Sequence, residues 1–118
     1  MHIAVLEVLR PIHDRATERL GRRYVVAFED TRLTVLRSGP NRPPSKYVEQ
    51  FDTHEELIVN VKEKLKRRFY HGYVLIWWHQ GFPLLNWIYD REYPVEYRAI
   101  LPPGIQLELP FFDWPSDP

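Results

Sequence analysis

The chain contains no cysteine, which excludes disulfide bonds, cysteine nucleophiles and thiolate metal sites together. It also lacks a long hydrophobic stretch: the longest apolar run, Tyr73 to Trp78, has six residues, whereas a membrane-spanning helix needs about 20. The N-terminal sequence MHIAVLEVLRP has no basic segment ahead of its apolar residues, as a secretion signal would. We therefore expect a soluble cytoplasmic protein that has no membrane partner.

Residues that would support catalysis are equally scarce. Only three serines occur, and none lies in a nucleophile-elbow context, while the five histidines show no metal-ligand spacing. There is no glycine-rich phosphate loop, and the carboxylate pair Glu55-Glu56 is better explained by the preference for acidic residues in the first turn of a helix. The sequence thus predicts a non-enzymatic protein with no catalytic residue, metal site or cofactor. An enzyme that uses His71 or His79 with a carboxylate is the less favoured alternative.

What the chain does contain is typical of one globular domain. It has 118 residues, of which 44% are hydrophobic and 27% charged. We expect a single domain over residues 1–100, followed by a proline-rich segment, 101–118, that is either a tail or a last strand. The net charge is zero, but residues 1–73 carry 14 basic and 10 acidic residues and residues 74–118 carry two and six. This asymmetry indicates either two surfaces for two kinds of partner or two halves that pair with each other.

The order of apolar and polar residues predicts an α+β fold. Runs rich in β-branched and aromatic residues predict strands at 2–9, 24–28, 32–36, 47–51 and 73–78. The second and third of these form a hairpin, and the proline-rich sequence SGPNRPPS at 38–45 predicts a loop. Residues 82–89 could form a strand or a short helix. We expect an antiparallel sheet of four to six strands with one principal helix packed on one face.

That helix is the clearest element in the sequence. Thr53 and Glu56 form a capping box at its start, and Gly72 is a natural stop at its end. Apolar residues recur between them at helical spacing and define one face, which comprises Leu57, Ile58, Val61, Leu65 and Phe69.

Basic residues gather in the second half of the helix and in the segment that precedes it. Five of the seven residues from 62 to 68 are basic. Phosphates need such charge, and unpaired bases need flat rings on which to stack, here Tyr47, Phe69 and Tyr70. The candidate nucleic-acid-binding residues are Arg37, Arg42, Lys46, Lys62, Lys64, Lys66, Arg67 and Arg68. The alternative interpretation is a solvated helix face beside a loop.

The succession of elements from 22 to 74 carries a family resemblance. The hairpin RRYVVAFEDTRLTVLRSGP leads to a basic segment, a strand that ends at Phe51, the capped helix with its late lysines, and Gly72-Tyr73. This order resembles the WGR domain, a small β-sheet module with one helix packed on it that occurs in poly(ADP-ribose) polymerases and in stand-alone bacterial proteins. The chain departs from the family at its signature, because LRSGP at 36–40 stands where Trp-Gly-Arg would fall. The resemblance implies a WGR-like scaffold in which Arg37 and Arg42 contact phosphate, whereas recognition of DNA ends does not carry over.

A second resemblance lies near the C-terminus. The sequence QLELPF at 106–111 is similar to the sliding-clamp-binding hexapeptide of bacterial polymerases and repair proteins. The resemblance implies that Gln106 fixes the register, that Leu109 and Phe111 fill apolar pockets of the clamp, and that Leu107 and Phe112 add contact area. The alternation of apolar and polar residues over 105–109 predicts, as the alternative, a last β-strand packed on the core.

Together these features favour a small accessory protein of bacterial DNA replication or repair. Such a protein would hold nucleic acid with its basic half and dock on a sliding clamp through its C-terminal peptide, each weak contact raising the effective concentration of the other. The alternative is a protein-interaction or assembly module that binds no nucleic acid. In that case the tail and the tryptophan-rich strand surface would bind a protein partner, although Trp77, Trp78 and Trp87 are most simply core residues.

Overall fold

The computed structural model describes residues 1–10, 19–40 and 42–102. The elements of this part are β1 (His2–Glu7), β2 (Arg23–Glu29), β3 (Arg32–Gly39), β4 (Arg42–Gln50), α1 (His54–Tyr70), β5 (Val74–Trp78) and α2 (Leu85–Asp90). No helix within these residues has the length and apolar character needed to cross a membrane. The clamp-like peptide, from Gln106 to Phe112, lies outside the described residues, and the expectation for it stays a prediction from the sequence.

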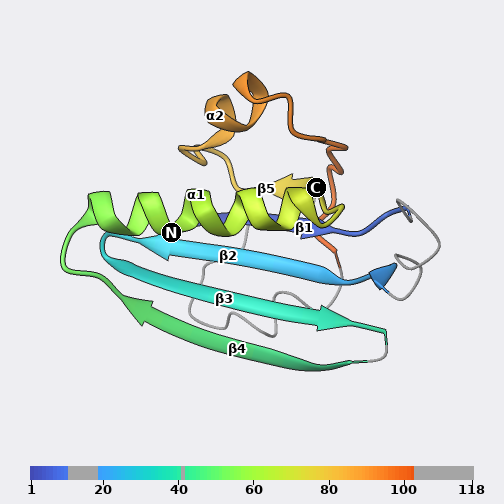
Figure 1. The fold of residues 1–118 in the computed structure, drawn as a ribbon, viewed down its shortest axis with the longest axis horizontal. Coiled ribbons are helices and arrows are strands. Elements are labelled where there is room, and N and C mark those ends of the chain that lie inside the picture. The colour runs from blue at the N-terminus through green and yellow to red at the C-terminus, as the bar shows by residue number, and fades with distance from the viewer. Residues whose placement is uncertain (11–18, 41, 103–118) are drawn as a thin grey trace.

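The strands form one antiparallel sheet in the order β4-β3-β2-β1-β5 (Figure 1). The chain lays down β1 to β4 as successive neighbours, returns across one face of the sheet as α1, and adds β5 beside β1 at the opposite edge. This architecture confirms the expected α+β class: five strands with one principal helix on one face. It also sets the second half of α1 above the strands that carry the basic segment.

Strands β1 and β2 are buried on both faces of the sheet, which explains their nearly continuous apolar sequences. Side chains on the face toward α1 belong to one core cluster, which includes Ala4, Leu6, Tyr24, Val26 and Phe28. The alternate side chains belong to a second cluster on the other face, which includes Ile3, Val5, Val25, Ala27 and Ile76. The alternation follows from the two-residue period of a strand.

Helix α1 begins and ends as the sequence predicts. The Oγ1 atom of Thr53 accepts a hydrogen bond from the backbone N–H of Glu56 at 3.2 Å, as expected for an N-cap. Leu57, Val61, Leu65 and Phe69 are buried against the sheet, and Ile58 is partly buried beside them. Gly72 follows the helix with a φ angle of 90°, a conformation that residues with a Cβ rarely adopt.

The expectation of a loop over residues 38–45 is wrong. Strand β3 continues to Gly39 and β4 already begins at Arg42, so most of this segment belongs to the sheet. Pro43 and Pro44 can lie in β4 because it is an edge strand, and because the pairing register shifts between Arg37 and Gly39. Arg37 therefore lies within a paired strand, between Tyr24 of β2 and Ser45 of β4.

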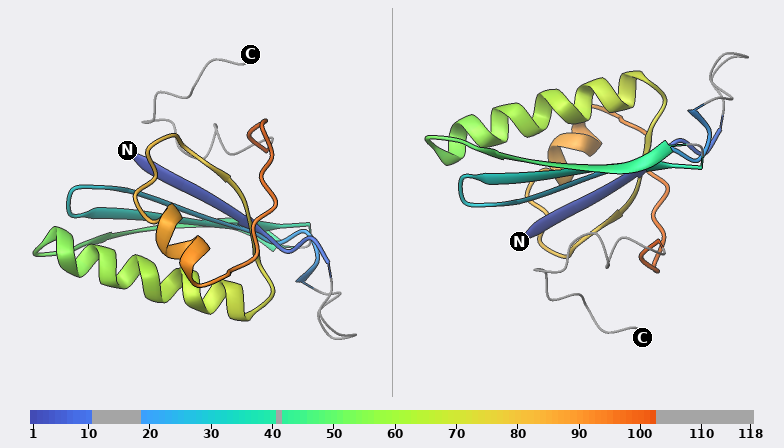
Figure 2. Two further views of the ribbon diagram at one scale, coloured as in Figure 1. Left: turned by 90° about the horizontal axis from the view of Figure 1, so that it is seen from above. Right: turned by 90° about the horizontal axis from the view of Figure 1, so that it is seen from below.

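The sequence left residues 82–89 open between a strand and a short helix, and the structure shows a short helix there, α2 (Leu85–Asp90). Helix α2 buries Ile88 in the core cluster on the side of α1, and Figure 2 shows it beside α1 near the β5 edge. The chain then follows β5, where Leu75 forms a parallel bridge with Val95. This leaves the other flank of α1, above β4, open to solvent.

Candidate functional site

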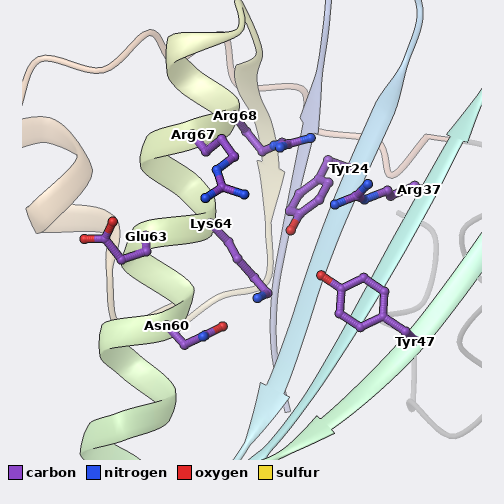
Figure 3. Close-up of a pocket in the computed structure, with 8 residues that line it drawn as sticks. All are labelled: Tyr24, Arg37, Tyr47, Asn60, Glu63, Lys64, Arg67 and Arg68. Atoms are coloured by element: carbon purple, nitrogen blue, oxygen red, sulfur yellow. The ribbon is translucent and has the colours of Figure 1, made fainter.

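A cavity of roughly 150 Å³ lies on that open flank, between α1 and the strands β2, β3 and β4. Its lining combines four cationic side chains with two tyrosines, one asparagine and one carboxylate (Figure 3). The lining residues are Tyr24, Arg37, Tyr47, Asn60, Glu63, Lys64, Arg67 and Arg68. Half of the candidate nucleic-acid-binding residues predicted from the sequence thus meet in one place.

Helical and strand spacing account for this convergence. On α1, Lys64 and Arg68 follow Asn60 at intervals of four residues and so project from the same flank of the helix. On the sheet, Arg37 of β3 is paired with Tyr24 of β2, and both belong to the face that α1 covers. Figure 3 shows these side chains reaching toward one another from the helix and from the strands.

Tyr24 occupies the centre of the site and is only 1% exposed. Burial raises the pKa of its hydroxyl well above the ordinary value, and a hydrogen bond to Tyr47 raises it further. The guanidinium groups of Arg37 and Arg68 lie 5.6 and 5.0 Å from the centre of the Tyr24 ring. The phenol therefore stays neutral, and its ring faces are engaged by cations.

The cations of the cavity are only partly neutralised. The Nζ atom of Lys64 lies 3.0 Å from Oε1 of Glu49, and Lys66, outside the cavity, approaches the lining carboxylate of Glu63 at 3.7 Å. Within the described residues, the three arginines of the cavity make no ion pair with a carboxylate. The lining consequently carries excess positive charge in a partly enclosed space, where salt screens it less than on an open surface.

Among the described residues, the acidic half of the chain does not supply the missing partners. Ion pairs between the two halves join Arg10 to Glu96 and Arg98 to Glu7, away from the cavity. The Lys62 ammonium also points elsewhere, 5.7 Å from the ring of Trp87 in α2. The ion pairs between the described parts of the two halves thus leave the charge of the cavity in place.

Three polar atoms of the lining are buried and unpaired: Nε of Arg37, Nε of Arg68 and Oδ1 of Asn60. A buried polar group without a hydrogen-bond partner costs about 1–3 kcal/mol. A bound group that brings acceptor oxygens to the two Nε–H donors would recover that free energy and would also balance the charge. The lining is therefore suited to an oxyanion, for which arginine is the preferred side chain.

The other candidate residues from the sequence lie outside this cavity. Arg42 and Lys46 are exposed on β4, and Lys46 is paired with Leu36, whose side chain belongs to the opposite face of the sheet. Lys62 and Lys66, on α1, do not line the cavity, although the Lys66 ammonium lies 3.7 Å from the lining carboxylate of Glu63. All four residues can contribute to the electrostatic field of this side of the protein from outside the cavity.

The aromatic residues near the basic segment differ in availability. Phe69 is buried and stacks on Tyr93 with 4.4 Å between ring centres, so it cannot stack on a base. The ring of Tyr47 has the Lys64 ammonium 5.9 Å from its centre, whereas Tyr70 is 84% exposed. Of the three rings proposed as stacking platforms, Tyr70 is the most open, while Tyr47 is 36% exposed.

Two important lining residues, Tyr24 and Asn60, are not among the residues predicted from the sequence. In the sequence, Tyr24 is one of several apolar residues of a predicted strand. Only the strand register shows that it lies opposite Arg37. Asn60 lies four residues before Lys64 on α1, so the i, i+4 relation to a predicted lysine could have identified it.

The arginines also affect a nearby histidine. The pKa of His71 is lowered from its ordinary value, first by burial and then by the charges of Arg19, Arg68 and Arg67. No group of three or more histidine and acidic side chains in the described part of the chain could hold a metal ion. The titratable chemistry of the site is thus dominated by cations.

Comparisons with protein-family models, with curated proteins and with solved structures give no match for this chain. The likeness to the WGR domain and to the clamp-binding peptide accordingly rests on the sequence, and the function is inferred from the site itself.

Proposed function

We propose that this protein is a non-enzymatic, nucleic-acid-binding accessory protein of bacterial DNA replication or repair, and that the cavity between α1 and the β2–β4 strands holds a backbone phosphate. The observation that carries the proposal is the convergence of Arg37, Arg67 and Arg68 without a carboxylate partner among the described residues, two of them with buried, unpaired Nε–H groups. Phosphate oxygens supply both the acceptors and the negative charge that this lining lacks.

The size of the cavity supports a phosphate group rather than a whole small molecule. Sites for drug-sized ligands and cofactors measure about 300–1,000 Å³, and this cavity measures roughly 150 Å³. A phosphate that belongs to a polymer needs only its own charged group inside, while neighbouring phosphates lie along the surface. The exposed Arg42, on the adjacent edge strand β4, is available for such neighbouring phosphates.

Contacts of this kind position a nucleic acid without reading its sequence. The burial of Tyr24 and the cations against its ring leave little opportunity for base stacking on this residue in the cavity. The exposed ring of Tyr70 adds one surface on which an unpaired base could stack. We therefore infer binding that depends strongly on salt and weakly on base sequence.

The second contact of the proposed function is the C-terminal peptide. Gln106, Leu107, Leu109, Phe111 and Phe112 lie outside the described residues, and docking on a sliding clamp is proposed from their sequence alone. Two weak contacts on one chain would tether the clamp and the nucleic acid to each other.

The affinity for a fluorescently labelled oligonucleotide, measured by anisotropy at increasing salt, tests the nucleic-acid contact. For about three phosphate contacts, the logarithm of the association constant should fall with the logarithm of salt with a slope near −2 for a single strand and near −3 for a duplex. Absence of binding to both probes at low salt would overturn the proposal.

Variants identify the cavity as the contact. Arg37→Gln and Arg68→Gln should each weaken binding and make the slope shallower by roughly one contact. Arg32→Gln is the matched control, because Arg32 lies on the same strand as Arg37, is exposed and does not line the cavity. Equal losses for the control and for the cavity variants would indicate a diffuse electrostatic surface instead of a site.

A further inference from the structure

The cavity is small for a nucleoside, because it measures roughly 150 Å³. Inside it, the ring of Tyr24 is engaged by Arg37 and Arg68, and the ring of Tyr47 has the Lys64 ammonium 5.9 Å from its centre. Any selectivity that arises inside the cavity must therefore come from the sugar–phosphate chain. The backbones of RNA and DNA differ there by one group, the 2′-hydroxyl, which both donates and accepts hydrogen bonds.

The unpaired atoms of the lining are of two kinds. The Nε–H groups of Arg37 and Arg68 need acceptors, whereas Oδ1 of Asn60 needs a donor. An internal phosphodiester has no proton to donate, so a DNA backbone pairs with the arginines and leaves Asn60 unsatisfied. In RNA, the 2′-hydroxyl is attached to the carbon next to the one that carries the 3′-phosphate, and one short unit presents acceptors and a donor together.

Asn60 and the arginines lie at different heights of the cavity. Asn60 lies on α1 four residues before Lys64 and eight before Arg68, and Figure 3 shows its amide turned from the helix toward the strands, on the same side as the Lys64 side chain. A phosphate held near Arg37 and Arg68 therefore has Asn60 farther along the same flank of the helix. The two kinds of unpaired atom therefore lie at different points along the cavity.

We propose that the cavity distinguishes RNA from DNA, with Asn60 Oδ1 accepting a hydrogen bond from a ribose 2′-hydroxyl while Arg37 and Arg68 bind a phosphate of the same strand. This proposal rests on the proposed function, since it requires a backbone phosphate in the cavity. It goes further by assigning RNA as the preferred ligand and Asn60 as the residue that confers the preference.

The test compares single-stranded RNA with DNA of the same base sequence, using the full-length protein and anisotropy at one fixed salt concentration. One buried hydrogen bond predicts that RNA binds about 3- to 10-fold more tightly. RNA methylated at every 2′-oxygen cannot donate this bond and should bind like DNA. Equal affinities for RNA and DNA would overturn the inference and leave the proposed function intact, whereas absence of binding to either would overturn both.

Asn60→Ala assigns the preference to its residue. Alanine is favourable in a helix, so this variant should fold. The 3- to 10-fold preference for RNA over DNA should disappear, so that the ratio of the two affinities falls to about one. Asn86→Ala, the same substitution at an exposed position of α2, is the control and should alter neither affinity. A loss of equal size for RNA and DNA in Asn60→Ala would contradict the assignment, because it would reflect a general change in the cavity.

Discussion

The guanidinium group of Arg68, on α1, lies 5.0 Å from the centre of the Tyr24 ring, on β2. This contact joins the helix to the sheet at the basic cavity. Packing against Tyr24 therefore restricts the conformations of the Arg68 guanidinium. A cation fixed in this way loses less conformational entropy when it binds a phosphate than a mobile surface lysine does. The site is therefore a product of the fold and is more than a run of basic residues on a helix.

Tyr24 predicts a loss of stability at alkaline pH. Its pKa in the folded protein is raised by burial and by Tyr47, while in the unfolded chain it is close to 10. Because only the unfolded state ionises readily, the free energy of unfolding should be constant with respect to this group below pH 10 and should fall as the pH rises further. Urea unfolding of the wild type between pH 8 and pH 11 measures the fall.

Tyr24→Phe should make that alkaline fall shallower, and Tyr70→Phe, at an 84% exposed position, should leave it unchanged. The same pH dependence in Tyr24→Phe and in the wild type would contradict the account of the buried phenol.

His71 serves as a reporter of charge in the cavity. Its pKa is lowered by burial and by Arg19, Arg68 and Arg67. A phosphate that neutralises Arg67 and Arg68 removes part of that repulsion, so an NMR titration should find a higher His71 pKa when an oligonucleotide is bound. His2 is the internal control, because its lowered pKa arises from burial and from groups other than these arginines. A His71 pKa that stays constant at saturation with the oligonucleotide would place the bound phosphate elsewhere.

The packing of α1 gives a prediction that is independent of function. Leu65 is 0% exposed between helix and sheet, whereas Val59, on the same helix, is 62% exposed. Leu65→Ala should lower the free energy of unfolding by about 2–5 kcal/mol, because it removes buried methyl groups and leaves a cavity. Val59→Ala should change it by less than about 0.5 kcal/mol. Chemical unfolding measures both, and similar values for the two variants would contradict the orientation of the helix.

The C-terminal peptide predicts competition at a bacterial sliding clamp. The full-length protein should displace a labelled clamp-binding peptide with a dissociation constant in the micromolar range or weaker, since ordering a short peptide offsets much of the free energy of apolar burial. Leu109→Ala combined with Phe111→Ala should abolish displacement, and Arg32→Gln should not affect it. Failure of the wild type to compete would remove the clamp from the proposed function.

The fold is largely predictable from the sequence because its signals are local. The capping interaction of Thr53 with Glu56, the apolar stripe through Leu65 and the paired runs of β2 and β3 each depend on residues near one another in the chain. The 38–45 segment is the exception. Its prolines indicate a loop, but tertiary structure makes β4 an edge strand, in which prolines need not break the sheet.

The candidate site is less predictable, because it depends on register. The basic residues of α1 are evident in the sequence, yet only their rotation about the helix axis separates Lys64, at the cavity, from Lys62, beside Trp87. The pairing of Arg37 with Tyr24 requires the alignment of two strands. Composition can therefore indicate a polyanion ligand, but it cannot identify the buried tyrosine and asparagine that shape the cavity.

The most direct test of the central claim observes the Nε–H groups of the arginines themselves. In a ¹H–¹⁵N spectrum, the Nε–H resonances of Arg37 and Arg68, assigned with Arg→Lys variants, should shift when a single-stranded oligonucleotide is added, while that of Arg32 should stay in place. Saturable binding that leaves the Arg37 and Arg68 resonances unmoved would contradict the claim that nucleic-acid phosphate occupies this cavity.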